Sequence, residues 1–151
     1  MILLTASWRD FWRVWQVQGV TFGRDAWDPL DLLLQLIFAP VRIKALDGER
    51  LVGYVFGERR QREGVGWITA LGVHPDARRR GVGRQLLQAA EARLAMPRVC
   101  LTVRPSNQTA IHLYAQLGYQ QTRRIPRYYP GGEDGQQMDK IPAASPSAEP
   151  F

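Results

Sequence analysis

The chain has 151 residues and a formal net charge of +6, which suits one domain of ordinary size with an anionic partner. Hydrophobic residues make up 45% of the sequence and charged residues 23%, as is ordinary for a globular protein. The single cysteine, Cys100, excludes an internal disulfide, and no Cys/His set has the spacing of a metal site.

The first third of the chain predicts one short strand and two helices. Residues 1–4 form the strand, and the hydroxyl of Ser7 is suited to cap a first helix. Asp28, followed by proline, marks the start of a second helix that ends before Pro40. The first helix carries aromatic side chains at helical spacing, which we expect to pack in the core: Trp8, Phe11, Trp12 and Trp15.

The rest of the chain predicts six further strands and two further helices. Helices are expected from Gly83 to about Leu94, and from Asn107 to a stop at Gly118. Apolar runs and turn residues mark the strands at residues 41–45, 51–57, 65–73, 99–103, about 119–128, and 136–141. This order predicts a mixed α/β domain over residues 1–141, with a largely antiparallel sheet and a strand–helix–strand crossover at its centre. We expect the Pro/Ala/Ser-rich tail, residues 142–151, to be flexible.

The turn between the strand at 65–73 and the next helix has the composition of a phosphate site. Gly81 and Gly83 let the backbone approach a ligand without a Cβ in the way. The N–H groups that open the helix have no intrahelical partners, so an anion there would satisfy them. A Walker A loop needs Gly-Lys-Ser/Thr, and a dinucleotide fingerprint needs a third glycine where Leu86 stands. From these residues alone, an ordinary strand-to-helix turn with a solvated basic face stays open.

Three motifs in order carry a family resemblance. The run from Arg78 to Gly83 resembles the Arg/Gln-x-x-Gly-x-Gly/Ala acetyl-CoA signature of the GCN5-related N-acetyltransferases (GNAT). Residues 101–107, 110–114 and 117–119 resemble the family's second signature, and residues 127–134 are similar to the ends of protein N-terminal acetyltransferases. The resemblance covers residues 1–141. It implies a three-layer fold whose sheet of six to seven strands is splayed at strands four and five and flanked by about four helices.

The resemblance also implies acetyl-CoA as cofactor and a role for each matching residue. Tyr114 would be the general acid, and Tyr128 and Tyr129 would line the acceptor groove together with Asp25. The implied cofactor-binding residues are Leu71, Gly72, Val73, Arg78, Arg79, Arg80, Gly81, Val82, Gly83, Arg84 and Asn107. Each has a plainer structural alternative: Asn107 as a helix N-cap, Tyr114 as core, and the two groove tyrosines as strand aromatics.

One position departs from the pattern. Thr102 stands where the resemblance implies a glutamate that acts as general base, and threonine cannot do that work. A second family position for an acid falls near Gln18. The base therefore stays open among Asp25, Glu133 and a chain of waters. An α-amine with a pKa of about 8 is roughly 10% neutral at pH 7, against about 0.04% for a lysine, so a weak base favours an N-terminal amine.

The sequence therefore predicts an acetyl-CoA-dependent N-acetyltransferase for the N-terminal α-amine of a protein or peptide. A small-molecule amine acetyltransferase and a non-catalytic acetyl-CoA-binding protein stay open. Residues 1–4 are too short for a signal peptide, and the most apolar run, residues 30–38, is too short to span a bilayer. No basic strip is interleaved with aromatics as in nucleic-acid-binding modules. We expect a cytoplasmic monomer or homodimer without membrane or nucleic-acid partners.

Overall fold

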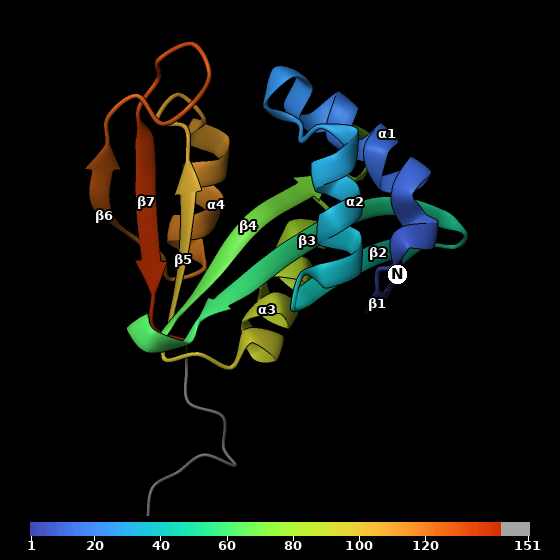
Figure 1. Cartoon of the computed structure of the whole chain (residues 1–151), viewed down its shortest axis with the longest axis horizontal. Helices are drawn as coiled ribbons and strands as arrows, with labels where there is room; N and C mark the ends of the chain where they lie inside the picture. The colour runs from blue at the N-terminus through green and yellow to red at the C-terminus, as the bar shows by residue number, and fades with distance from the viewer. Residues whose placement is uncertain (143–151) are drawn as a thin grey trace, which may run out of the picture.

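The computed structural model describes residues 1–142, and these form a seven-stranded mixed sheet covered by helices on both faces (Figure 1). The strands are β1 (Ile2–Thr5), β2 (Val41–Asp47), β3 (Arg50–Arg60), β4 (Val65–Val73), β5 (Arg98–Val103), β6 (Gln120–Ile125) and β7 (Gly135–Lys140). The α-helices of this part of the chain are α1 (Phe11–Phe22), α2 (Pro29–Phe38), α3 (Val82–Leu94) and α4 (Gln108–Gln116). Apart from Pro142, the expected flexible tail lies outside the described residues.

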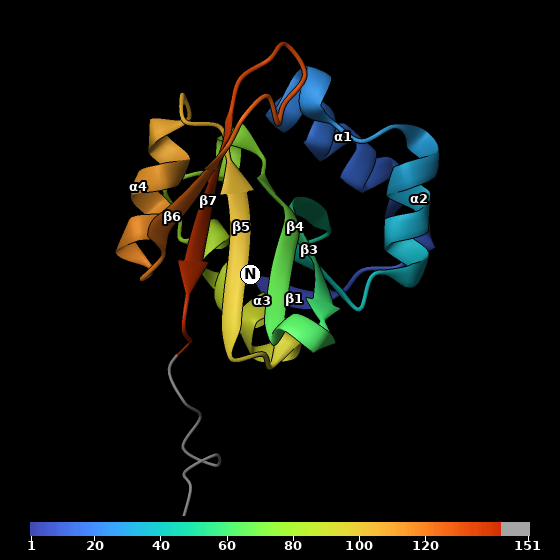
Figure 2. The same cartoon turned by 60° about the vertical axis from the view of Figure 1, so that its left-hand side comes forward.

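The strand order is β1-β2-β3-β4-β5-β7-β6, and β4–β5 is the parallel pair at its centre. Helix α3 supplies the crossover between these two strands, as parallel neighbours require. Helices α1 and α2 lie on one side of the sheet and α4 on the other (Figure 2). The expected mixed α/β fold is confirmed.

The centre of the sheet is split. β4 and β5 are paired only from Val65 to Trp67, and beyond that point β4 turns away from β5 (Figure 1). A bulge in the β3–β4 ladder leaves Thr69 without a partner residue at the point of divergence. Bulges bend a strand and increase its twist, which accounts for the change in direction. Thr69 is exposed although β4 is the central strand, so the split opens to solvent.

Two apolar clusters, one on each face, hold the split sheet in place. The larger one packs α3 and part of α4 onto the sheet, with Leu86, Leu87 and Leu94 from α3 among its buried members. The smaller one lies under α1 and α2 and includes Tyr54 and Phe56 of β3. Side chains alternate along a strand, so neighbouring residues of β4 face different clusters. The two faces of the split are therefore chemically distinct.

The expectation that the whole aromatic stripe of the first helix is core was wrong. Trp8 and Trp12 are 58% and 71% exposed, whereas Val14 and Val17 are buried. A 3₁₀ turn (Trp8–Asp10) precedes α1 and separates Trp8 from the helical repeat. Trp12 lies two residues, or about 200° around the helix, from Val14, and so faces away from the sheet. The two tryptophans instead border an open hollow of about 430 Å³ between α1 and α2.

None of the helices between residues 1 and 142 has the length and apolarity to cross a bilayer. The same residues contain no cluster of three or more His, Cys, Asp or Glu side chains able to hold a metal ion.

Candidate active site

The end of β4 offers unpaired backbone groups to the split. The His74 N–H donates to Val52 O at 2.8 Å, so His74 faces β3. Residues of an antiparallel strand alternate between facing their partner and facing away, which places the N–H and C=O of Leu71 and Val73 on the side of the split. The resemblance implies that Gly72 binds the cofactor, but its backbone N–H and C=O face β3 and not the split. A Cβ on Gly72 would lie 2.7 Å from the Tyr54 ring, so this glycine makes room for a side chain of the protein.

The glycine-rich turn opens α3 without a side-chain cap. Gly81 is the N-cap residue, with φ +77°, and no side chain accepts a hydrogen bond from the first turn. The backbone N–H groups at the start of the helix are therefore free for an anion. A Cβ on Gly83 would meet only ordinary van der Waals contacts, at 3.5 Å and beyond. This agrees with the acetyl-CoA signature, which allows glycine or alanine at this position. These features fit the diphosphate of acetyl-CoA.

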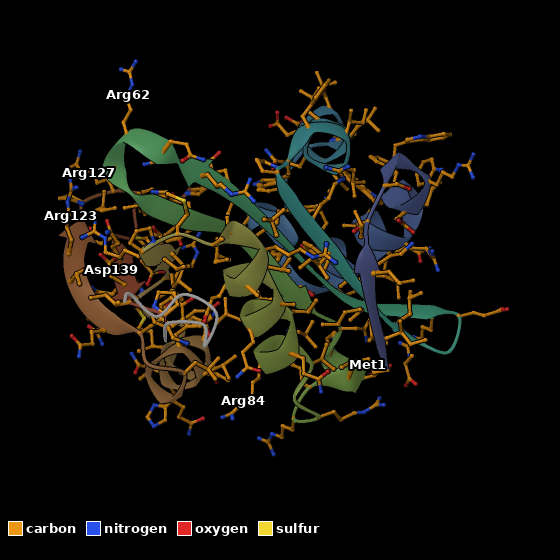
Figure 3. All side chains as sticks on the ribbon, turned by 90° about the horizontal axis from the view of Figure 1, so that it is seen from below. Met1, Arg62, Arg84, Arg123, Arg127 and Asp139 are labelled. Atoms are coloured by element: carbon orange, nitrogen blue, oxygen red, sulfur yellow. The ribbon has the colours of Figure 1, made fainter. Side chains whose placement is uncertain are left out.

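The arginines of this turn do not all point into it. Arg80 donates to Asp47 Oδ2 at 2.9 Å, which ties it to the β2–β3 turn. Arg78 Nε donates to the Val73 carbonyl at 3.4 Å, at the edge of the split. Arg84 projects outward from the first turn of α3 (Figure 3). The turn therefore offers its backbone N–H groups first, and its arginine side chains provide the surrounding positive charge.

Tyr114 lies on α4, partly buried against the larger cluster. Its ring meets the Tyr119 ring edge-on, with the centroids 6.0 Å apart. Burial raises the pKa of Tyr114 to about 12, so its hydroxyl stays protonated at neutral pH. Among the described residues, this hydroxyl has no hydrogen-bond partner, which leaves it available as a donor. Asn107 caps α4, because its Oδ1 accepts from Ala110 N at 3.2 Å; its contact with the cofactor stays a prediction.

The other face of the split, under α1, carries the residues expected at the acceptor groove. Thr102 of β5 contacts Gly135 so closely that a Cβ there would lie 2.8 Å from Thr102 Cγ2 and 2.9 Å from Tyr128 Cβ. Tyr128 and Tyr129 lie in the β6–β7 loop, with ring centroids 4.8 Å apart. Thr102, which stands where the resemblance implies a glutamate, therefore lies next to Tyr128 of the expected acceptor groove.

The three carboxylate or amide positions considered for a base have other partners. Asp25 and Glu133 both accept hydrogen bonds from Arg104, at 2.6 and 2.9 Å. The hydrogen bond from Arg104, together with those from Ser106, holds the pKa of Glu133 below its usual range. Gln18 is buried, and its amide pairs with the backbone N–H and C=O of Trp27. Among the described residues, both carboxylates considered for the base are therefore ion-paired with Arg104.

Sequence reasoning missed the part that Arg104, Tyr54 and Gly135 play. Arg104 stands inside one of the quoted motifs, and a charge directly after a buried strand was the available signal. Nothing local links it to Asp25, 79 positions away in the chain. The packing of Tyr54 on Gly72 and of Thr102 on Gly135 depends on strand pairing, which local patterns do not reveal.

The sequence comparison agrees with this geometry. The profile of the Acetyltransferase (GNAT) family matches residues 5–119, and the chain belongs to this family. It is 38% identical over 100 residues to the N-terminal acetyltransferase B complex catalytic subunit NAA20 of Arabidopsis thaliana. That alignment covers 62% of this chain and 57% of the relative, so the chain spans little more than half of that protein's length.

Solved structures share the fold. The ribosomal-protein-S18-alanine N-acetyltransferase of Escherichia coli superposes with a TM-score of 0.84 at 20% identity, covering 99% of both chains. Naa20 of Chaetomium thermophilum, solved with a bisubstrate analogue, superposes with a TM-score of 0.78 at 23% identity, covering 93% of this chain and 86% of that one. At these identities the likeness shows the fold alone.

Proposed function

We propose that this chain transfers the acetyl group of acetyl-CoA to the N-terminal α-amine of a protein or peptide. Acetyl-CoA supplies an activated thioester carbonyl. The split beyond Trp67 is the observation that carries the proposal, because it leaves the backbone of Leu71 and Val73 without a partner strand on the β5 side, beside an uncapped helix start. The helix start would hold the diphosphate, and an N–H of β4 would hold the thioester oxygen.

The chain's own groups would move one proton, that of Tyr114. The neutral amine nitrogen attacks the carbonyl carbon, a C–N bond forms and the C–S bond breaks. The Tyr114 hydroxyl donates its proton to the departing sulfur. It suits this role because it is protonated at neutral pH and has no hydrogen-bond partner among the described residues. The proton of the acylated nitrogen leaves to water, and the Tyr114 oxygen takes a proton back from solvent. The products are an amide and free CoA thiol.

The choice of an α-amine rests on the missing base. In the described part of the chain, the two carboxylates considered for a base are both paired with Arg104, which favours an acceptor that arrives neutral. An α-amine is neutral far more often than a lysine at pH 7. The name of the NAA20 relative and the S18-alanine acetyltransferase structure favour the same acceptor class. A cytoplasmic location and a monomeric or homodimeric state go with this proposal.

Mass spectrometry of acetylated products tests the proposal. The protein and acetyl-CoA are incubated with an alanine-initiated peptide that contains one lysine, with its N-terminally blocked form, and with spermidine. We expect the mass increase on the free N-terminus alone. Equal acetylation of the blocked peptide would identify a lysine acetyltransferase, and acetylation of spermidine alone would identify a small-molecule enzyme. Binding of acetyl-CoA without any transfer would leave a non-catalytic binding protein.

A further inference from the structure

Arg104 occupies the junction of two loops that come from opposite ends of the chain. It follows directly after β5, and its side chain is 17% exposed. Its Nε and Nη2 donate to both carboxylate oxygens of Asp25, each at 2.6 Å, in the 3₁₀ turn between α1 and α2. This two-pronged contact matches the planar guanidinium to a carboxylate, a geometry that lysine cannot reproduce.

The same guanidinium also holds the β6–β7 loop. Its Nη1 donates to Glu133 Oε1 at 2.9 Å, and its Nη2 donates to the Pro130 carbonyl at 3.2 Å. Ser106 holds the Glu133 carboxylate in place by donating from both its N–H and its hydroxyl, at 2.9 and 3.0 Å. One side chain thus fastens two loops that share no strand or helix with each other.

Arg104 also orients the tyrosines of the expected groove. Its guanidinium carbon lies 4.6 Å from the centroid of the Tyr129 ring, within the range of a cation–π contact. Tyr129 in turn meets Tyr128 edge-on. The Tyr129 N–H donates to the Glu133 carbonyl, so the backbone of this loop is fixed from within as well. The α1–α2 loop is fixed a second time by the Gln18 amide on Trp27.

We infer that Arg104 is a positioning residue for the acceptor, which clamps the α1–α2 loop to the β6–β7 loop and so sets the shape of the groove between them. This inference rests on the proposed function, because it takes the face of the split under α1 as the acceptor side. Asp25 and Glu133 are the two anchors of the clamp: Asp25 accepts from Arg104 through both carboxylate oxygens, and Glu133 accepts from Arg104 and from Ser106. Among the described residues, no hydrogen bond or ion pair of Arg104 goes to β4 or α3, the elements of the acetyl-CoA side.

Steady-state kinetics with two varied substrates tests the clamp. The variants are Arg104→Met, Arg104→Lys, Asp25→Asn and the Arg104→Met/Asp25→Asn double variant, assayed with a lysine-free, alanine-initiated peptide. Loss of the clamp should raise the KM for the peptide about 10-fold or more, since loosening the groove costs orientation of the amine. The Kd for acetyl-CoA should stay at the wild-type value. The two single effects should not add in the double variant, because both remove one contact.

The matched control is Arg98→Met. Arg98 begins the same strand and pairs with Asp139 of β7 at 3.5 Å, but it lies at the closed end of β5, away from both loops. Its kinetic constants should match those of the wild type. Arg104→Lys keeps the charge but has neither the planar fork that meets both Asp25 oxygens nor enough donors for all four contacts, so it should resemble Arg104→Met. An unchanged peptide KM in Arg104→Met, or a lysine variant with wild-type kinetics, would overturn the inference.

Hydrogen exchange tests the clamp without any acceptor. In Arg104→Met, amides of residues 23–28 and of residues 127–134 should lose protection together, while those of β3 keep it. Asp25→Asn, the milder change, gives the same readout if Arg104→Met folds poorly. Loosening of one loop alone would contradict a clamp. If the wild-type protein acetylates no peptide, the proposed function is overturned instead. The two failures are distinguishable, because this one is measured on the wild type before any variant is made.

Discussion

Thr102 and Gly135 touch across β5 and β7 at the base of the expected acceptor groove. A Cβ at position 135 would lie 2.8 Å from Thr102 Cγ2 and 2.9 Å from Tyr128 Cβ. Such distances essentially never occur for real Cβ atoms. The atoms in the way are close to the backbone in their side chains, and a rotamer change cannot move Tyr128 Cβ aside. Gly135 is therefore required for the packing that seats Tyr128.

Replacing Gly135 by alanine should destabilise the protein by about 1–3 kcal/mol, the usual cost of overpacking a filled site. Chemical denaturation measures this loss. Gly19→Ala is the control, because Gly19 is exposed within α1 and a Cβ there meets nothing within 4 Å. That change should add up to about 1 kcal/mol of stability through helix propensity. Equal effects of the two substitutions would contradict the packing argument.

Tyr114→Phe removes the proposed proton donor while keeping the ring. We expect turnover to fall by about 10²- to 10⁴-fold, with the Kd for acetyl-CoA unchanged by calorimetry. The control is Tyr119→Phe, whose hydroxyl donates to Glu91 at 3.0 Å behind Tyr114. Removing the Tyr119 hydroxyl leaves the buried Glu91 carboxylate with one hydrogen-bond donor fewer. The free energy of unfolding should therefore drop by about 1 kcal/mol, while kcat stays unchanged. Loss of acetyl-CoA affinity in Tyr114→Phe would make this residue structural instead.

Gly81→Ala tests the uncapped start of α3. Gly81 has φ +77° with open space around it, so alanine would strain the backbone by about 1–2 kcal/mol without a clash. Because that backbone turn aims the first N–H groups of α3, acetyl-CoA should bind about 10-fold more weakly, as calorimetry can measure. Gly64→Ala has a similar φ of +67° and equally open surroundings in the β3–β4 turn. It should carry the same stability cost with unchanged binding.

Local signals account for most of the fold. Asp28 and Asn107 each cap a helix as their residue types predict, because a cap depends on neighbours within three positions. Ser7 also caps, but it caps the 3₁₀ turn that leads into α1 and not α1 itself. The orientation of Trp12 was not predictable in the same way, because it depends on which face of α1 meets the sheet. The Arg104 clamp joins residues far apart in the chain, and only the folded loops bring them together.

The missing glutamate at Thr102 gives the last prediction. At pH 6, an α-amine with a pKa of about 8 is only about 1% neutral, so a base beside it should matter most at low pH. Thr102 points to the acceptor side, next to Gly135 and Tyr128, where a longer carboxylate side chain would reach the groove. Thr102→Glu should therefore raise kcat/KM at pH 6 by about 10-fold over Thr102→Gln, with the gap closing toward pH 9 as the amine deprotonates unaided. Glutamine has the same size and carries the same packing cost in this tight corner, so the ratio of the two variants isolates the proton transfer. A ratio of one across the pH range would mean that no base is lacking, and that the acceptor reaches this enzyme neutral by another path.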